Sequence, residues 1–254
     1  DVGTAGSIPL ILQVLIPAVS LLRKKLRISI TGGTDVPWSP TSNYTKFVLG
    51  EAYSRIGIGF SLNVKRRGYY PKGRGLIEVE VTPAKNLIPI SLTERTTRSA
   101  NFLCSYSKLS QDQIHSEIDE VRMILEKDGF QCNFSVTEDD AIDKGCSFLV
   151  FSHDDRSIVG TDAIYEKSLN GIGKFVANKF IETNHGVDLF LSDMLVVPLS
   201  LIKDTSVFRV KQITKHLETN LFVAAKMTGC RYGIGKVDDG FEVRISGISD
   251  SRMQ

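Results

Sequence analysis

The sequence lacks the features that would place it at once in several large classes of protein. Its net charge is only +2 over 254 residues, so the chain as a whole has no strong electrostatic attraction to nucleic acid. Basic residues gather only in short runs, at 23–27, 65–67 and 72–74, and each run taken singly is typical of a solvated surface. None of the four cysteines is spaced as C-x-x-C, which argues against a zinc site or a redox motif.

Long hydrophobic runs are also missing. The most apolar stretch, residues 8–22, is shorter than the ~20 residues that span a bilayer, and it contains two prolines. No positively charged segment precedes it, as one would in a signal peptide. We therefore expect a buried helix there, no membrane partner and a cytoplasmic location. The cysteines are then expected to be buried thiols, although pairing among Cys104, Cys132 and Cys146 stays open.

What the sequence does contain is one order of elements that occurs twice. With 42% hydrophobic and 24% charged residues the composition is that of a globular protein. In residues 1–89 the patterns predict, in order, a helix at 7–24, a strand at 26–30, a helix at 42–55 and strands at 59–65 and 76–81. In residues 158–254 they predict, in the same order, a helix at 188–202, a strand at 206–210, a helix at 218–227 and strands at 231–237 and 241–245.

A different segment, residues 90–157, separates the two repeats. A helix is predicted from Ser110, which forms a capping box with Gln113, and strands are predicted at 101–106, 131–136 and 147–152. A further helix at 162–182 leads into the second repeat. We therefore expect an α/β (α+β) fold with tandem repeats of two helices on a four-stranded sheet and a small α/β insert domain. The chain opens on Asp1-Val2-Gly3, in what looks like the end of a strand, so a fragment of a longer protein is expected.

The most informative short run is Lys215–Asn220, which contains His216, one of only four histidines. The run lies where a strand pattern gives way to a helix pattern. A neutral imidazole at such a junction can act as a nucleophile or a proton shuttle. A lone histidine is more often structural, so the run needs support from the rest of the chain.

That support comes from a family resemblance carried by motifs in a fixed order. They are Gly3-Thr4-Ala5-Gly6-Ser7, Gln13, Gly32-Gly33-Thr34-Asp35 with Pro37 and Pro40, Gly68-Tyr69-Tyr70-Pro71 with Gly73 and Gly75, His185-Gly186-Val187-Asp188 with Leu191-Ser192-Asp193, and His216-Leu217 with Thr219-Asn220. Each motif is weak alone, but together they resemble the RNA 3'-terminal phosphate cyclases. The resemblance implies three tandem units with an insert before the last, so that the first unit would be absent from this chain.

The resemblance also implies a reaction. The family uses ATP to convert an RNA 3'-phosphate to a 2',3'-cyclic phosphate, and the histidine that matches His216 carries AMP as a covalent intermediate. The expected substrates are therefore ATP and RNA with a 3'-phosphate end, and the expected cofactor is a divalent metal, Mg or Mn, with ligands that the sequence does not define. Adenylation suits the problem, because AMP is a good leaving group where a bare phosphate oxygen is not.

Further positions match the family's ATP pocket. They are Gln13, Pro40, Phe190, Leu191, Ser192, Asp193 and Met194. Phe190 is expected to stack on adenine opposite Pro40, and Asp193 to reach the metal or hold His216, while core, turn and solvated positions are the competing interpretations. The backbone of the Gly32–Gly33 turn is expected to contact phosphates. Met194 departs from the family, which commonly has glutamine there.

Three alternatives remain open at this point. A non-catalytic cyclase-like RNA-binding protein of ribosome assembly would share the fold but lack the nucleophilic histidine. An enolpyruvyl transferase would use a similar repeat fold without an adenylated histidine. A plain RNA-binding module would use the basic runs. A homodimer is compatible with the long apolar helix, although nothing specifies one.

Overall fold

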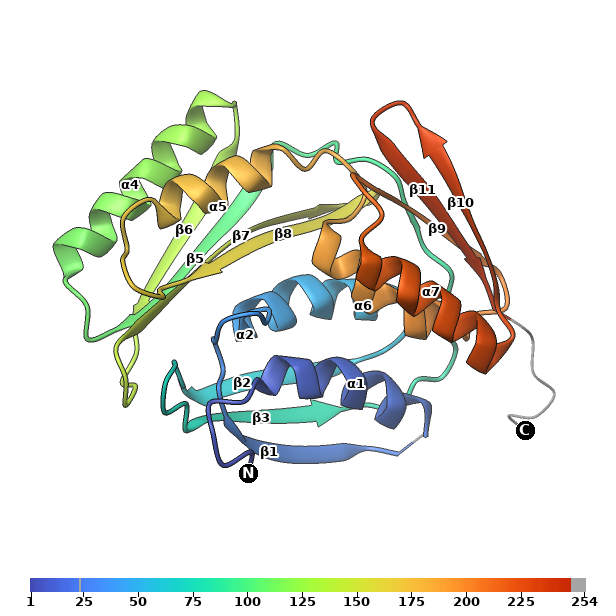
Figure 1. The fold of residues 1–254 in the computed structure, drawn as a ribbon, viewed down its shortest axis with the longest axis horizontal. Helices are drawn as coiled ribbons and strands as arrows, with labels where there is room; N and C mark the ends of the chain where they lie inside the picture. Colours follow the sequence, from blue (N-terminus) through green and yellow to red (C-terminus); the bar gives the residue numbers. More distant parts are fainter. Residues whose placement is uncertain (23, 248–254) are drawn as a thin grey trace.

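The protein combines helices with three separate β-sheets, which confirms the predicted fold class. A computed structural model describes residues 1–22 and 24–247. The strands form one sheet in the order β1-β3-β2, a second in the order β10-β11-β9-β4 and a third in the order β6-β5-β7-β8. Figure 1 shows the first sheet at the bottom, the second at the upper right and the third at the upper left.

The first repeat unit packs its helices on an antiparallel sheet. Its elements are α1 (Ile8–Leu21), β1 (Leu26–Gly32), α2 (Ser42–Tyr44), the π-helix η1 (Thr45–Leu49), α3 (Gly50–Arg55), β2 (Phe60–Arg66) and β3 (Gly75–Val81). α1 begins where the sequence predicts, because the Ser7 hydroxyl accepts a hydrogen bond from Leu10 N–H at 3.2 Å. Pro9 fits the first turn, where its missing N–H leaves no bond unmade.

The last unit repeats this arrangement strand for strand. Its elements are β4 (Ser91–Leu92), α6 (Leu189–Leu199), β9 (Thr205–Val210), α7 (Lys215–Thr228), β10 (Arg231–Val237) and β11 (Gly240–Ser246). β3 lies between β1 and β2, and β11 lies in the same way between β9 and β10. β4 runs parallel to β9, and in the matching place beside β1 the Val2 N–H donates to Thr31 O at 3.0 Å. The tandem repeat is therefore visible in the strand pairing.

The third sheet carries its own helices and its own core. Its elements are β5 (Ser99–Ser107), α4 (Gln111–Lys127), β6 (Gln131–Glu138), β7 (Gly145–Asp154), β8 (Ser157–Ile164) and α5 (Ile172–Ile181). Figure 1 shows α4 and α5 on the same face of this sheet. The sequence predicts one helix at 162–182, but residues up to 164 extend β8 because they pair with β7, and the helix begins only at Ile172.

The strand pairing bears on the predicted ranges 1–89, 90–157 and 158–254, which stay a prediction as domains. Residue 157 lies at the start of β8, which pairs with β7, so a boundary there divides a hairpin. Val159 and Phe180, beyond that boundary, belong to the same core as Phe102 and Phe148 of the insert. Leu92, inside the range 90–157, instead belongs to the core of the repeat units.

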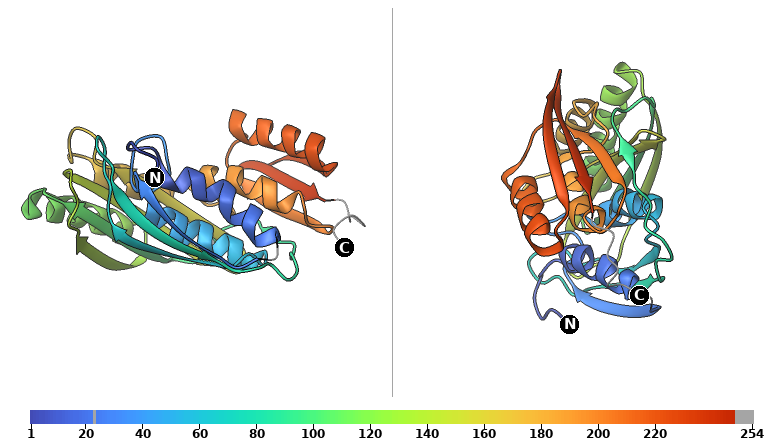
Figure 2. Two further views of the ribbon diagram at one scale, coloured as in Figure 1. Left: turned by 90° about the horizontal axis from the view of Figure 1, so that it is seen from below. Right: turned by 90° about the vertical axis from the view of Figure 1, so that its right-hand side faces the viewer.

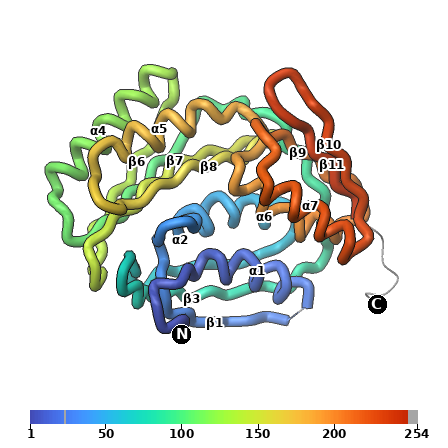
Figure 3. The backbone as a smooth tube through the Cα atoms, in the orientation of Figure 1, coloured from blue at the N-terminus to red at the C-terminus, as the bar shows by residue number. Residues whose placement is uncertain are grey.

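One hydrophobic core joins the two repeat units. It includes Leu12 of α1, Val48 of η1, Leu195 of α6 and Leu221 of α7. Figures 1 and 2 show α1 and α2 on the side of the first sheet that faces the rest of the molecule, and the chain trace in Figure 3 shows the same layering. The two units therefore hold one another's helices in place, as a repeat that cannot cover its own apolar face requires.

A buried ion pair connects the first unit to the insert. The side chain of Asp35 is fully buried, and Arg67 Nη1 donates to its Oδ2 at 2.9 Å. Arg67 also donates from Nη2 to Asn43 Oδ1 at 2.9 Å and from Nε to Asp139 Oδ2 of the insert at 3.1 Å. The carboxylates of Asp35 and Asp139 keep the Arg67 guanidinium charged, raising its pKa, although burial opposes this. The charges are compensated only while all partners are present.

We predict that Arg67→Met lowers the free energy of unfolding by about 3–5 kcal/mol, because it leaves the buried Asp35 carboxylate unpaired. Arg66→Met, at the exposed neighbouring position, is the matched control and should cost less than about 1 kcal/mol. Urea denaturation at pH 7 measures both. Adding Asp35→Asn to Arg67→Met should restore part of the loss, and equal costs for the Arg67 and Arg66 variants would contradict the explanation.

Candidate active site at the junction of α6 and α7

Two hydrogen bonds fasten α6 to the beginning of α7. Thr214, the N-cap of α7, accepts from Leu217 N–H at 2.9 Å and donates its hydroxyl to the Asp193 carboxylate at 3.2 Å. Asn220 Nδ2, further along α7, donates to the Asp193 carbonyl oxygen at 3.3 Å. Asp193 therefore contacts α7 with both its side chain and its backbone, which fixes the first turns of the two helices relative to each other.

His216 lies exposed in the first turn of α7. The sequence predicts this helix from about Glu218, but it begins at Lys215 because Thr214 caps it. The signal for the earlier start is Thr214 ahead of the apolar series at 217, 221 and 224. Burial raises the pKa of Asp193, while the hydroxyl of Thr214 and the nearby His216 act in the opposite direction. His216 and Asp193 thus lie within electrostatic reach of each other.

Phe190, three residues before Asp193 on α6, is half exposed. Its ring meets that of Tyr44 edge-on, with ring centroids 6.3 Å apart. It borders a cavity of about 670 Å³ between the first unit, the insert and α6. The other residues that line this cavity are Val36, Pro37, Trp38, Ser39, Thr41, Asp162, Ala163, Ile164, Glu166, Ser168, Asn170, Gly171, Ile172 and Phe175. The size is that of ordinary small-molecule sites.

Asp162 is the titratable group in this cavity whose pKa departs from the ordinary range. Burial raises the pKa of Asp162 to about 6, although Thr41 N–H donates to its Oδ2 at 2.6 Å. The sequence gave no separate indication of Asp162, Trp38 or Phe175 as site residues. They come from three distant segments, so no local spacing connects them.

The other predicted site residues differ in what they offer a ligand. Leu191 and Met194 are buried in the core that joins the repeat units. The buried Ser192 donates its hydroxyl to Leu189 O at 2.7 Å. Of the run 190–194, Phe190 and Asp193 therefore have the side chains most accessible to a ligand. The assignment of the run to nucleotide binding stays a prediction.

Gln13 and Pro40 lie in separate elements of the first unit. Gln13 is half-buried in α1, and its carbonyl oxygen accepts the Tyr53 hydroxyl at 3.4 Å. Pro40 is buried just before the N-cap of α2, and it is absent from the lining of the cavity that Phe190 borders. Its neighbours Ser39 and Thr41 do line that cavity. Pro40 is thus beside the predicted adenine position rather than on its surface.

The Gly32–Gly33 turn does not offer the free N–H groups that the phosphate prediction requires. Gly33 N–H donates to Gly6 O at 2.8 Å and Thr34 N–H to Gly68 O at 2.9 Å, while Gly32 pairs with Gly75 in the sheet. A Cβ on Gly33 would lie 2.5 Å from Ala5 O. Glycine is needed there because protein backbones pack closely, and this part of the prediction is wrong.

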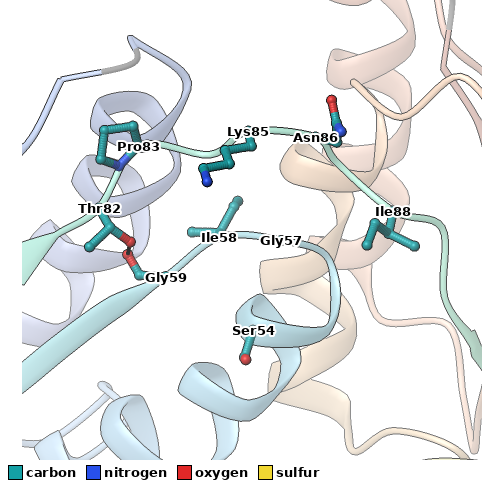
Figure 4. A pocket seen from close by; sticks show the side chains of 9 residues that line it. All are labelled: Ser54, Gly57, Ile58, Gly59, Thr82, Pro83, Lys85, Asn86 and Ile88. Carbon is teal, nitrogen blue, oxygen red and sulfur yellow. Dashed lines mark hydrogen bonds between the residues drawn. The ribbon is translucent and has the colours of Figure 1, made fainter.

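A second cavity lies away from the predicted residues. Figure 4 shows its lining, which comes from the turn after α3 and the segment after β3. It measures about 660 Å³, and Lys85 is the single charged residue among those that line it. Thr82 closes one side by donating its hydroxyl to Gly59 O at 2.9 Å. This cavity contains no acid–base pair and none of the residues that the sequence singled out.

Two wider searches cover the described residues, 1–22 and 24–247. Within them no group of three or more His, Cys, Asp or Glu side chains is placed to hold a metal ion. No helix in that part of the chain has the length and apolar character needed to cross a membrane. All four cysteines are free thiols, and Cys132 is the one that is not fully buried.

Asp188 holds the first turn of α6 in place. Its Oδ1 accepts Leu191 N–H at 3.0 Å and the Tyr44 hydroxyl at 2.7 Å, and its Oδ2 accepts Gly160 N–H at 2.9 Å. Burial raises the pKa of Asp188 to about 6 against these hydrogen bonds. The side chain thus links α6 to the first unit and to β8, and it orients Phe190 and Asp193.

A repeated α+β unit with an exposed histidine at a helix start defines a class that comparison with known proteins makes specific. Residues 1–234 match the family model described as RNA 3'-terminal phosphate cyclase. Relatives of that name include those of Methanococcoides burtonii (32% identical, covering 96% of this chain and 73% of the relative), Saccharolobus solfataricus (32%, 96% and 74%) and Hyperthermus butylicus (29%, 98% and 74%). The chain belongs to the RNA 3'-terminal phosphate cyclase family, which confirms the resemblance.

We predict a pH-dependent effect of Asp188→Asn. The folded protein keeps the Asp188 proton up to about pH 6, whereas the unfolded chain releases it near the ordinary value of 3.8. This stabilisation is therefore complete below about pH 4 and is lost as the pH rises through about 6. Asparagine lacks it, so the variant should be less stable than the wild type by on the order of 2 kcal/mol more at pH 4 than at pH 7.

Denaturant unfolding between pH 4 and pH 7 measures this difference. Asp155→Asn, at an exposed position, is the matched control, and its difference from the wild type should not change with pH. A constant cost of Asp188→Asn across the range would mean that the carboxylate stays ionised in the folded protein.

Proposed function

We propose that this protein is an ATP-dependent RNA 3'-terminal phosphate cyclase that works through a covalent adenylate on His216. Membership of the cyclase family supports the overall activity. The single observation that supports the mechanism is the exposed imidazole of His216 in the first turn of α7, beside Asp193 on α6. A nucleophile must be reachable by ATP and RNA in turn, and an exposed helix start meets that need.

Three bond exchanges make up the proposed reaction. In the first, His216 Nε2 forms a bond to the α-phosphorus of ATP, and the bond from that phosphorus to the pyrophosphate oxygen breaks. In the second, an oxygen of the RNA 3'-phosphate attacks the same α-phosphorus, and the bond to His216 breaks. In the third, the neighbouring 2'-hydroxyl loses its proton and attacks the RNA phosphorus, which releases AMP and leaves the 2',3'-cyclic phosphate.

Asp193 is the proposed positioning residue. A nucleophilic Nε2 must be unprotonated, so Nδ1 carries the proton and benefits from an acceptor. Asp193 is held toward α7 by Thr214, which leaves carboxylate oxygen capacity for the imidazole. Phe190 would stack on adenine, since its ring is 54% exposed at the edge of the cavity.

A divalent metal, Mg or Mn, belongs to this proposal only as an ion brought with the triphosphate. The described residues contain no three-residue acidic or histidine cluster that fits a resident metal, so no step is assigned to one. The second proposed partner is RNA with a 3'-phosphate. The alternative function is that of a non-catalytic cyclase-like protein that binds RNA in ribosome assembly, which would require His216 to be inert.

We predict that His216→Ala abolishes adenylation of the protein. The full-length protein is incubated with ATP labelled at the α-phosphate and either Mg or Mn, and acid-labile label on the protein is measured. His115→Ala, at an exposed position in α4, is the matched control and should retain full labelling. Labelling that survives in His216→Ala would refute this nucleophile. No labelling in the wild type, together with retained RNA binding, would favour the non-catalytic alternative.

A further inference from the structure

The conformation and exposure of Trp38 are unusual for so large an apolar residue. Its backbone has φ +60°, in the left-handed region that side chains other than those of Gly, Asn and Asp rarely adopt. Its side chain is 98% exposed to solvent. Both features are unfavourable for the isolated protein, and such outliers cluster at functional sites. Trp38 is also not among the glycines and prolines that carry the family resemblance in this turn.

Trp38 lies on the same cavity as two further exposed aromatic side chains. Phe175 of α5 is 52% exposed and Phe190 of α6 is 54% exposed, and both line the cavity with Trp38. The three rings come from the turn after β1, from the insert and from the last unit. Polar groups for a planar ligand's edge are also present, namely Ser39, Asp162, Glu166, Ser168 and Asn170. Aromatic faces combined with a few polar groups are how proteins bind unpaired nucleobases.

The charge of the lining distinguishes a base from a phosphate. Two acidic residues, Asp162 and Glu166, line the cavity, and none of its lining residues is Lys or Arg. A phosphate would be repelled there, whereas a neutral base that donates N–H groups would be accepted. Adenine stacked on Phe190 would use one of the three aromatic rings and leave those of Trp38 and Phe175 available.

The cavity is connected to the proposed nucleophile through one helix. Phe190 and Asp193 are three residues apart on α6 and therefore lie on neighbouring positions of its surface. Asp193 in turn is fastened to the start of α7, where His216 lies. A nucleotide whose base enters the cavity would therefore present its sugar and phosphate near the residue that carries AMP.

We propose that this cavity binds the 3'-terminal nucleobase of the RNA by stacking on Trp38 and Phe175. The proposal rests on the cyclase function, and it names the part of the RNA that the protein grips. Stacking tolerates any of the four bases, so the site would accept RNA ends of different sequence.

Trp38 is the only tryptophan of the chain, so its fluorescence tests the proposal directly. An RNA oligonucleotide with a 3'-phosphate should quench this fluorescence in the full-length protein, and the same oligonucleotide with an abasic 3'-terminal nucleotide should not. ATP alone should leave it largely unchanged. Quenching by ATP but not by RNA would assign the cavity to adenine and overturn the proposal.

Kinetics of the variants provide the second test. Trp38→Ala and Phe175→Ala should raise KM for the RNA about tenfold and leave adenylation of His216 by ATP unchanged. Trp38→Phe should restore most of the affinity, because a ring is retained. With abasic RNA the wild type should already show the tenfold loss, and Trp38→Ala should add nothing. Tyr232→Ala, on β10, is the control exposed aromatic and should behave as the wild type.

The outcomes separate the two proposals. If the wild type is not adenylated, the cyclase mechanism fails whatever Trp38 does. If the wild type is adenylated and cyclises RNA, but Trp38→Ala and abasic RNA change neither KM nor fluorescence, the terminal-base site is refuted. A loss of adenylation in Trp38→Ala would likewise refute it, because the cavity would then serve ATP.

Discussion

The buried carboxylate of Asp188 is the interaction on which the arrangement of the site depends. It satisfies a free N–H of the first turn of α6, the hydroxyl of Tyr44 and the N–H of Gly160, which belong to three different packed layers. Burying a carboxylate is unfavourable unless several donors surround it, so these donors must arrive together. The direction of α6, and with it the positions of Phe190 and Asp193, follows from that requirement.

The turn that carries Trp38 is held at both ends. Asp35 before it is paired with Arg67, and Thr41 after it donates its N–H to Asp162 of β8. The middle of the turn is thus free of packing while its ends are fixed to the first unit and to the third sheet. This is the condition under which an exposed side chain can be pre-organised for a ligand, since little freedom remains to be lost on binding.

The sequence predicted much of the fold because local signals and packing agree in most elements. Ser7 caps α1 as expected, and the order of helices and strands in each repeat follows from periodicity. Prediction failed where tertiary pairing decided the outcome: residues 162–164 read as helix but pair with β7, and Ser110 makes no side-chain capping bond to α4. The cavity around Trp38 was not predictable, because its rings lie far apart in the sequence.

The glycine-rich turn shows why a motif can be identified correctly and interpreted wrongly. Its glycines allow the chain near Ala5 to approach the backbone of Gly33, and its N–H groups are consumed by that packing. The phosphates of a bound nucleotide must therefore be met elsewhere. Because the cavity between the turn, the insert and α6 is lined by acidic and aromatic side chains, it favours the base and excludes the phosphates. A nucleotide that enters base first is oriented by this contrast in charge, and its phosphates remain outside, on the side where a nucleophile on α7 could reach them.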